Sequence, residues 1–109
     1  MILFEPEHVQ LILQGIKTQT RRTGKHRWKI GAIRQAKTGY KKDSEFAKIR
    51  ILAVRQERLV DISESDALAE GYKSIREYMD VFIRIYGSWN GKSMVWVIDF
   101  ELVNETKID

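Results

Sequence analysis

The chain has 109 residues with 43% hydrophobic side chains, so we expect a single domain over residues 1–109 with a core of its own. It contains no cysteine, which excludes a disulfide framework and a thiolate metal site. Its two histidines show no metal-ligand spacing, and we expect neither a metal nor another cofactor. No apolar run approaches the roughly 20 residues that cross a bilayer, and the start of the chain lacks the pattern of a signal peptide. These properties predict a cytoplasmic protein without a membrane partner.

The net charge is +4, but the charges are unevenly distributed along the chain. Residues 1–58 hold 14 of the 19 basic and 5 of the 15 acidic side chains, which gives +9 there and −5 over residues 59–109. A basic segment of this kind is typical of a surface that binds a polyanion. The alternative is a solubilising surface rich in charge, which is compatible with the first interpretation. We favour an anionic partner.

The first predicted element is a short helix over residues 6–14. Proline at position 6 suits the first turn of a helix, where its missing N–H costs nothing, and Gly15 supplies a C-terminal stop. We expect His8 on the exposed side of this helix. Apolar side chains recur at helical spacing, namely Val9, Ile12 and Leu13.

A series of strands is predicted next. Polar alternation with two threonines favours an exposed or half-exposed strand over residues 17–22. Glycine at position 31 marks a turn or bulge in a second strand. The remaining ranges are a basic loop over 23–29, the second strand over 30–36, a polar turn over 39–44, and one long strand or a bent pair over 46–60.

Two helices and a final strand complete the chain. Ser63 is a suitable N-cap for the first helix, and Gly71 ends it. The second helix begins with a capping-box pattern over 74–77 and ends at Gly87. Residues 94–103 are dense in β-branched and aromatic side chains, which predicts a central strand. Because strands do not alternate regularly with helices, we expect an α+β fold with a small mixed or closed sheet and helices at its side.

The reactive side chains are concentrated in the stretch GIKTQTRR. Arginine offers a planar fork for phosphate or a base edge, and lysine offers a point charge. The positive charges of Arg21, Arg22 and Lys25 disfavour the ammonium form of Lys17. They are expected to lower its pKa towards that of a general base. A basic strand without any catalytic role remains the alternative. In an ideal strand the period of two divides the side chains into Thr18, Thr20 and Arg22 on one face and Gln19 and Arg21 on the other.

That period also places Lys17 and Thr20 on opposite faces. Catalysis by both residues therefore requires Lys17 to lie in the turn before the strand. Glu70 lies near the end of a helix, where a carboxylate is mildly unfavourable. A specific cation, either Lys17 or Arg22, would explain its position, and an exposed glutamate before a glycine is the alternative.

The sequence resembles the ASCH domain family, whose members share a PUA-like β-barrel. The resemblance extends in order over nearly the whole chain. It rests on the GIKTQTRR stretch, the RWKIG stretch at 27–31, the ALAEGY stretch at 67–72, the aromatic-rich helix ending IYG at 85–87 with Trp89, and the closing strand over 95–100.

This resemblance implies a small PUA-like β-barrel, a mixed closed sheet with flanking helices, whose basic cleft binds RNA or a modified nucleoside. The best-defined enzymes of similar size in this family are amidohydrolases that deacetylate 4-acetylcytidine with a Lys–Thr–Glu set, which corresponds here to Lys17, Thr20 and Glu70. By that analogy Thr20 attacks the amide carbonyl, Lys17 acts as base, and Glu70 orients Lys17 or relays a proton. Other relatives resemble ribonucleases or RNA-binding modules, so the fold does not settle the activity.

The sequence departs from the small amidohydrolases in being more basic. Arg21 stands where those enzymes tend to have an apolar residue, and the loop before residue 30 and the hairpin near residue 41 are rich in lysine. These departures favour a longer polyanionic ligand, so we predict an RNA-associated binding protein, with a hydrolase as the alternative. Trp28 either stacks on a base or covers the core. The predicted RNA or substrate contacts are Arg21, Arg22, Lys25, Arg27, Trp28 and Lys29.

Overall fold

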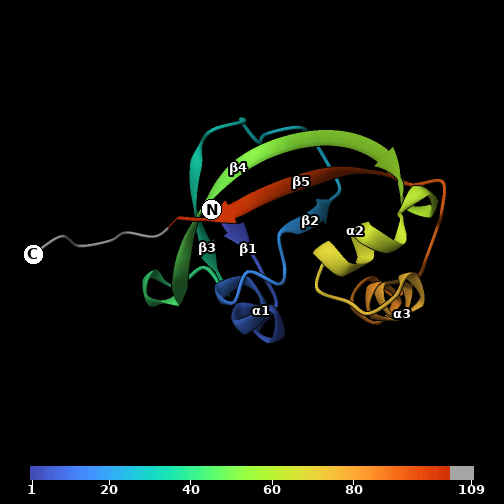
Figure 1. Cartoon of the computed structure of the whole chain (residues 1–109), viewed down its shortest axis with the longest axis horizontal. Helices are drawn as coiled ribbons and strands as arrows, with labels where there is room; N and C mark the ends of the chain where they lie inside the picture. The colour runs from blue at the N-terminus through green and yellow to red at the C-terminus, as the bar shows by residue number, and fades with distance from the viewer. Residues whose placement is uncertain (104–109) are drawn as a thin grey trace, which may run out of the picture.

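Five strands form one mixed sheet in the computed structural model, which describes residues 1–103 (Figure 1). The order across the sheet is β1-β3-β4-β5-β2, and β1 runs parallel to β3 while the other neighbours are antiparallel. The strands are β1 (Ile2–Leu3), β2 (Gln19–Arg22), β3 (Ile33–Lys37), β4 (Glu45–Arg58) and β5 (Met94–Leu102). The α+β class and the mixed sheet are therefore as predicted.

The prediction of a closed sheet is wrong, because the sheet is curled but open. β1 and β2 are its two edges and do not pair with each other. β1 has only two residues, and Pro6, which cannot donate a ladder hydrogen bond, follows shortly after it. The chain turns away there into a short helix, so β1 offers too little backbone for closure.

The long strands β4 and β5 give the sheet its curvature (Figure 1). They pair from Ile49 opposite Leu102 to Arg58 opposite Met94. The register shifts between Ile51 and Ala53, and such a bulge increases the local bend and twist of a strand. β5 lies between β4 and β2, which confirms the prediction of a central final strand.

The helices lie on the inner side of this curve (Figure 1). Ser63 and Ser74 cap α2 and α3, because their hydroxyl oxygens accept hydrogen bonds from the backbone N–H groups of Asp66 and Glu77. The long helix α3 ends at Gly87, as predicted. The helical segments are η1 (Pro6–His8), α1 (Val9–Leu13), η2 (Lys42–Ser44), η3 (Leu59–Asp61), α2 (Glu64–Ala69) and α3 (Ile75–Tyr86).

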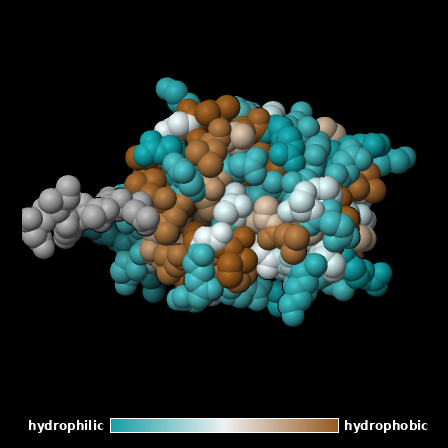
Figure 2. Space-filling view, in the orientation of Figure 1, coloured by the Kyte–Doolittle hydropathy of each residue, from teal (hydrophilic) through white to brown (hydrophobic). Residues whose placement is uncertain are grey.

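The core follows the sheet in separate clusters. The largest joins the N-terminal segment and α1 to the middle of the sheet, with Ile12, Ile49 and Phe100 among its buried members. A second group, built on Ile62 and Tyr78, holds α2 and α3 together. Hydrophobic residues gather on the visible face towards the end that carries α1 and β1, and hydrophilic residues cover most of the other end (Figure 2). None of the helices in residues 1–103 has the length and apolar character needed to cross a bilayer.

Candidate functional site

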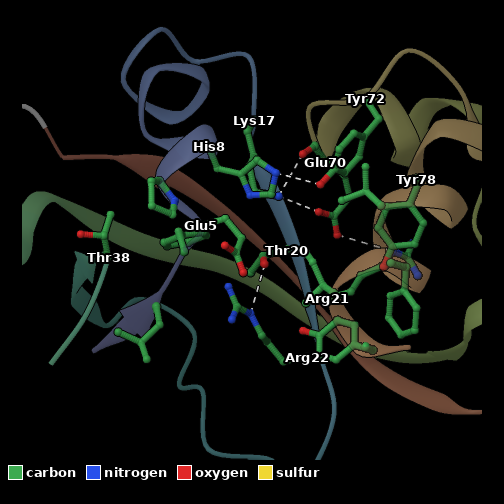
Figure 3. Close-up of a pocket in the computed structure, with 17 residues that line it drawn as sticks. Glu5, His8, Lys17, Thr20, Arg21, Arg22, Thr38, Glu70, Tyr72 and Tyr78 are labelled. Carbon is green, nitrogen blue, oxygen red and sulfur yellow. Dashed lines mark hydrogen bonds and ion pairs between the residues drawn. The ribbon is translucent and has the colours of Figure 1, made fainter. Parts of the chain in front are cut away.

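A pocket of about 290 Å³, here the first pocket, lies between the two edges of the sheet (Figure 3). Its volume is close to the lower end of the range of small-molecule sites, about 300–1,000 Å³. The first pocket contains five of the predicted site residues, Lys17, Thr20, Arg21, Arg22 and Glu70. The rest of its lining is Leu3, Phe4, Glu5, Pro6, His8, Thr38, Tyr72, Tyr78, Val81, Phe82, Ile85 and Tyr86.

Lys17 lies in the turn between α1 and β2, outside the strand, because β2 begins only at Gln19. Its backbone N–H donates to the carbonyl of Leu11 at 3.0 Å, and the next N–H, that of Thr18, donates to the carbonyl of Ala69 at 2.7 Å. The first bond joins the turn to α1, and the second joins it to the end of α2. They bring Lys17 next to Glu70, which is the local geometry that a joint role of these residues requires.

Gly71 permits this close approach. Its φ is +99°, a conformation that L side chains rarely adopt, and a Cβ atom there would lie 3.1 Å from Leu11 Cδ1 and 3.5 Å from Lys17 Cβ. The glycine after Glu70 therefore both ends α2 and leaves room for the turn that carries Lys17.

The ammonium group of Lys17 donates three hydrogen bonds in a buried environment, and Figure 3 shows the two that go to Glu70. Nζ lies 2.6 Å from Glu70 Oε2, 2.9 Å from the Glu70 carbonyl oxygen and 2.8 Å from the Gln19 carbonyl oxygen. Lysine has three N–H donors when protonated, so every donor is used. All three partners are acceptors, and the site accordingly suits the charged form.

Burial lowers the pKa of Lys17 from its ordinary value, while the Glu70 carboxylate acts in the opposite direction. The direction agrees with the sequence prediction, but the principal cause differs. Arg22 contributes only a smaller lowering than burial does, and Arg21 and Lys25 are not among the causes.

The two oxygens of the Glu70 carboxylate are held unequally. Oε2 accepts from Lys17, whereas Oε1 has no hydrogen bond within residues 1–103 and lies 3.8 Å from Arg21 Nε. Glu70 lines the first pocket and is 4% exposed, and this oxygen is a buried acceptor. The helix-end carboxylate thus has Lys17 as its specific cation.

Thr20 and Arg22 interact with each other at the same wall. The Nε of Arg22 donates to Thr20 Oγ1 at 3.2 Å, and its guanidinium lies 5.2 Å from the centre of the Phe4 ring (Figure 3). Thr20 has no hydrogen bond to Lys17 among the described residues. Burial lowers the pKa of Arg22, which still remains protonated at neutral pH.

Arg21 is placed differently from its neighbour. Its side chain is 1% exposed and forms ion pairs with Glu57, with Asp66 at 3.1 Å and with Glu70. Although it was predicted to contact the ligand, its charge is already neutralised inside the protein. Its place on the strand face opposite Arg22 accounts for the difference, since that face meets α2.

The other four predicted contacts lie outside the first pocket. Lys25, Arg27 and Lys29 are exposed, while Trp28 is 5% exposed and belongs to the largest core cluster. Trp28 therefore covers the core, which was one of the two predicted roles. Arg27 and Trp28 line a neighbouring second pocket of about 400 Å³, whose lining is Met1, Ile2, Leu3, Arg22, Arg27, Trp28, Arg34 and Tyr40.

His8 was expected on the helix surface, but it lies in the wall of the first pocket and is 8% exposed. Its Nε2 is 2.7 Å from the hydroxyl oxygen of Tyr72. Burial, with a further effect from the charge of Lys17, lowers the pKa of His8 to about 4, so the imidazole is neutral at pH 7. The missed signal was its position four residues before the buried Ile12, on the same side of the helix.

Comparisons with known proteins place the chain in a family. A family model described as ASCH domain matches residues 1–104. No curated protein sequence matches the chain. Within the part of the chain that the structure describes, no cluster of three or more His, Asp or Glu side chains could hold a metal ion.

Solved structures show the same fold at low sequence identity. An ASCH domain from Lactobacillus crispatus JV V101 superposes with a TM-score of 0.75 at 16% identity, covering 94% of this chain and 76% of that one. A protein from Enterococcus faecalis V583 gives 0.69 at 23% identity, with 89% and 67% covered. An ASCH protein from Zymomonas mobilis gives 0.65 at 18% identity, with 93% and 67% covered.

Proposed function

Because the chain belongs to the ASCH domain family, which is associated with RNA, we propose that its first pocket binds one nucleoside unit, free or within an RNA strand. A volume of about 290 Å³ suits a single small unit better than a folded RNA segment. A base that belongs to an RNA strand enters such a pocket when it is turned out of its stack.

The observation that carries the proposal is the half-satisfied carboxylate of Glu70. Burying an ion pair costs desolvation energy that its attraction does not always recover, so such a pair is weak evidence of a purely structural role. One oxygen of this pair additionally lacks a donor, which costs free energy in a buried site. An N–H group of a ligand in the first pocket would supply that donor.

The neighbouring groups extend this pattern. The Thr20 hydroxyl accepts from Arg22 and keeps its own proton to donate to a ligand. Tyr72 and Tyr78 line the same pocket and offer rings that a base could stack against. An acceptor and a donor in one pocket suit a base that has both an amino group and a ring nitrogen, as cytosine and adenine do.

The test compares Glu70→Gln with Glu64→Gln, which removes an exposed carboxylate from the same helix. Affinities for cytidine and for short single-stranded RNAs are measured by isothermal titration calorimetry. A hydrogen bond to a charged group is worth about 1.5–3 kcal/mol, so Glu70→Gln is expected to weaken binding about 10- to 100-fold, and Glu64→Gln is expected to leave it unchanged. Equal affinities of the two variants would overturn the proposal.

Hydrolysis of an acylated nucleoside is the second candidate, because Lys17, Thr20 and Glu70 line one pocket. In that reaction the Thr20 oxygen attacks the acyl carbonyl, the C–N bond breaks, and the amine leaves with a proton. Water then hydrolyses the threonine ester. Each step needs a base that accepts a proton from the attacking group.

The arrangement of protons favours binding over hydrolysis. Lys17 already donates all three of its protons to acceptors, and it has no free lone pair while it is protonated. It could act as a base only after it had transferred a proton to Glu70, at 2.6 Å, and had turned its lone pair towards Thr20. Burial favours such a neutral pair, but the observed contacts do not direct it at Thr20.

Hydrolysis is tested by offering 4-acetylcytidine to the native protein and to Thr20→Val and Thr20→Ser. Cytidine is separated from the acetylated form by chromatography. If Thr20 is the nucleophile, Thr20→Val is expected to lose turnover by at least about 100-fold, whereas Thr20→Ser keeps a hydroxyl and retains part of it. Turnover by Thr20→Val at the native rate would exclude this role.

A further inference from the structure

The nine arginines of the sequence fall into two groups. Six form ion pairs with carboxylates, namely Arg21, Arg50, Arg55, Arg58, Arg76 and Arg84. The other three, Arg22, Arg27 and Arg34, have no carboxylate partner within residues 1–103. All three line the second pocket, which contains no acidic side chain. Unpaired arginines are thus gathered at one place, although they come from β2, from the loop after it and from β3.

The second pocket adjoins the first. Both are lined by Leu3 and Arg22, so the two pockets share part of their wall. Arg22 stands at the boundary, since its Nε is directed to Thr20 in the first pocket. A ligand that has its base in the first pocket would therefore extend past Arg22 into the second.

Two of the guanidinium groups are oriented by aromatic rings. Arg22 lies over Phe4 at 5.2 Å and Arg27 over Trp28 at 5.6 Å from the ring centres. A guanidinium stacked on a ring uses its face for that contact and keeps its N–H groups, which lie in its plane, for an anion. Arg34 directs one nitrogen to the carbonyl of Ile33 at 3.2 Å, and its other terminal nitrogen has no hydrogen bond within residues 1–103. Phosphate is the anion that such planar forks match best.

From these observations we infer that the second pocket holds the phosphate of a nucleotide whose nucleoside occupies the first pocket. This inference rests on the proposed function, and it specifies the ligand as a phosphorylated nucleoside rather than a free one. The shared chemistry is a phosphate ester of the bound sugar. Its source is either a free nucleotide or the backbone of an RNA strand.

The test measures the affinities of four probes by isothermal titration calorimetry at constant ionic strength. The probes are cytidine, cytidine 5′-monophosphate, cytidine 3′-monophosphate and the trinucleotide of cytidine. The variants are Arg27→Gln and Arg34→Gln. The control is Arg76→Gln, which removes an equal charge from an exposed position on α3.

The native protein is expected to bind at least one phosphorylated probe about tenfold or more tightly than cytidine. Arg27→Gln and Arg34→Gln should each abolish most of this gain without weakening the binding of cytidine, and Arg76→Gln should preserve it. Dependence of the trinucleotide on both arginines identifies the RNA backbone as the source. The same dependence for a monophosphate, with no gain for the trinucleotide, identifies a free nucleotide.

Three results would overturn the inference. The first is that no phosphorylated probe binds more tightly than cytidine, and the second is that Arg76→Gln reduces the gain as much as the other variants do. The third is that polyglutamate displaces the trinucleotide more effectively than cytidine monophosphates do, which would make the second pocket a site for an acidic peptide. If phosphorylated probes bind through Arg27 and Arg34 while Glu70→Gln changes no affinity, the phosphate site stands and the proposed nucleoside site fails.

Discussion

The two neighbouring pockets differ in whether the protein itself neutralises their positive charges. In the first pocket Lys17 is buried, and protein acceptors take all three of its protons. In the second pocket Arg27 and Arg34 have no carboxylate partner among the described residues, and Arg27 is exposed. A buried, neutralised charge fixes geometry for recognition of an uncharged polar group. An unpaired charge near solvent costs little and keeps its attraction for an anion.

The largest effect that this comparison predicts is on stability. Lys17→Met leaves the Glu70 carboxylate buried without its cation, and breaking a buried pair in this way costs about 3–5 kcal/mol. The double variant Lys17→Met, Glu70→Leu should recover much of that loss. Lys25→Met, which removes an exposed lysine, is the control. Urea unfolding measures all three, and a Lys17→Met protein as stable as the native one would show that the pair is not buried in solution.

A pH effect comes next. The pKa of His8 is 6.5 in the ordinary case and about 4 in the folded protein. Between these values the unfolded chain binds a proton that the folded protein does not, so the contribution of His8 to stability is lost as the pH falls from about 6.5 to about 4. The loss amounts to at most about 3 kcal/mol.

His8→Gln removes this contribution but keeps a polar partner for Tyr72. The free energy of unfolding of the variant should therefore fall less steeply with decreasing pH than that of the native protein. Urea unfolding between pH 4 and 7 measures both slopes. Identical slopes would mean that His8 is accessible to protons in the folded state.

A smaller effect distinguishes the backbone around each pocket. Gly71 beside Lys17 and Gly24 in the loop that leads to Arg27 both have positive φ, but only Gly71 has side-chain atoms close to where a Cβ would lie. Replacement by alanine costs roughly 1–2 kcal/mol for the conformation alone. Gly71→Ala should cost more than Gly24→Ala in thermal unfolding, and the opposite order would contradict the close packing at Lys17.

The smallest effect concerns the stability of the second pocket. Arg27→Gln and Arg34→Gln break no ion pair among residues 1–103, so the free energy of unfolding should change by less than about 0.5 kcal/mol. The loss of stability in Lys17→Met is then several-fold larger than in either arginine variant. A large loss in either arginine variant would mean that the second pocket is a structural element.

The sequence predicted the individual helices and strands better than it predicted whether the sheet closes. Caps such as Ser63 and Ser74, and the dense apolar strand that became β5, are local signals, and the structure has them where expected. Whether the sheet closes depends on β1, a two-residue strand that is too short to leave a periodic pattern. The open edge was therefore beyond sequence reasoning, although it is where the first pocket lies.

The site residues likewise include one pair that the sequence predicted and one residue whose contacts it did not. A carboxylate at a helix end predicted a neighbouring cation, and Lys17 is that cation for Glu70. The charge of Arg21 is neutralised by Glu57, Asp66 and Glu70, which are far from it in sequence. These carboxylates approach it only through the pairing of β2 with β5 and the packing of α2. No local pattern distinguishes such a neutralised arginine from Arg22 beside it.

In the proposed complex, the first pocket receives a base at Glu70 and the second pocket receives its phosphate. A crystal structure with cytidine 5′-monophosphate bound tests it most directly. We expect the amino nitrogen of the base about 3 Å from Glu70 Oε1, with the phosphate among Arg22, Arg27 and Arg34. A base outside the first pocket, with Glu70 Oε1 still lacking a donor, would contradict it.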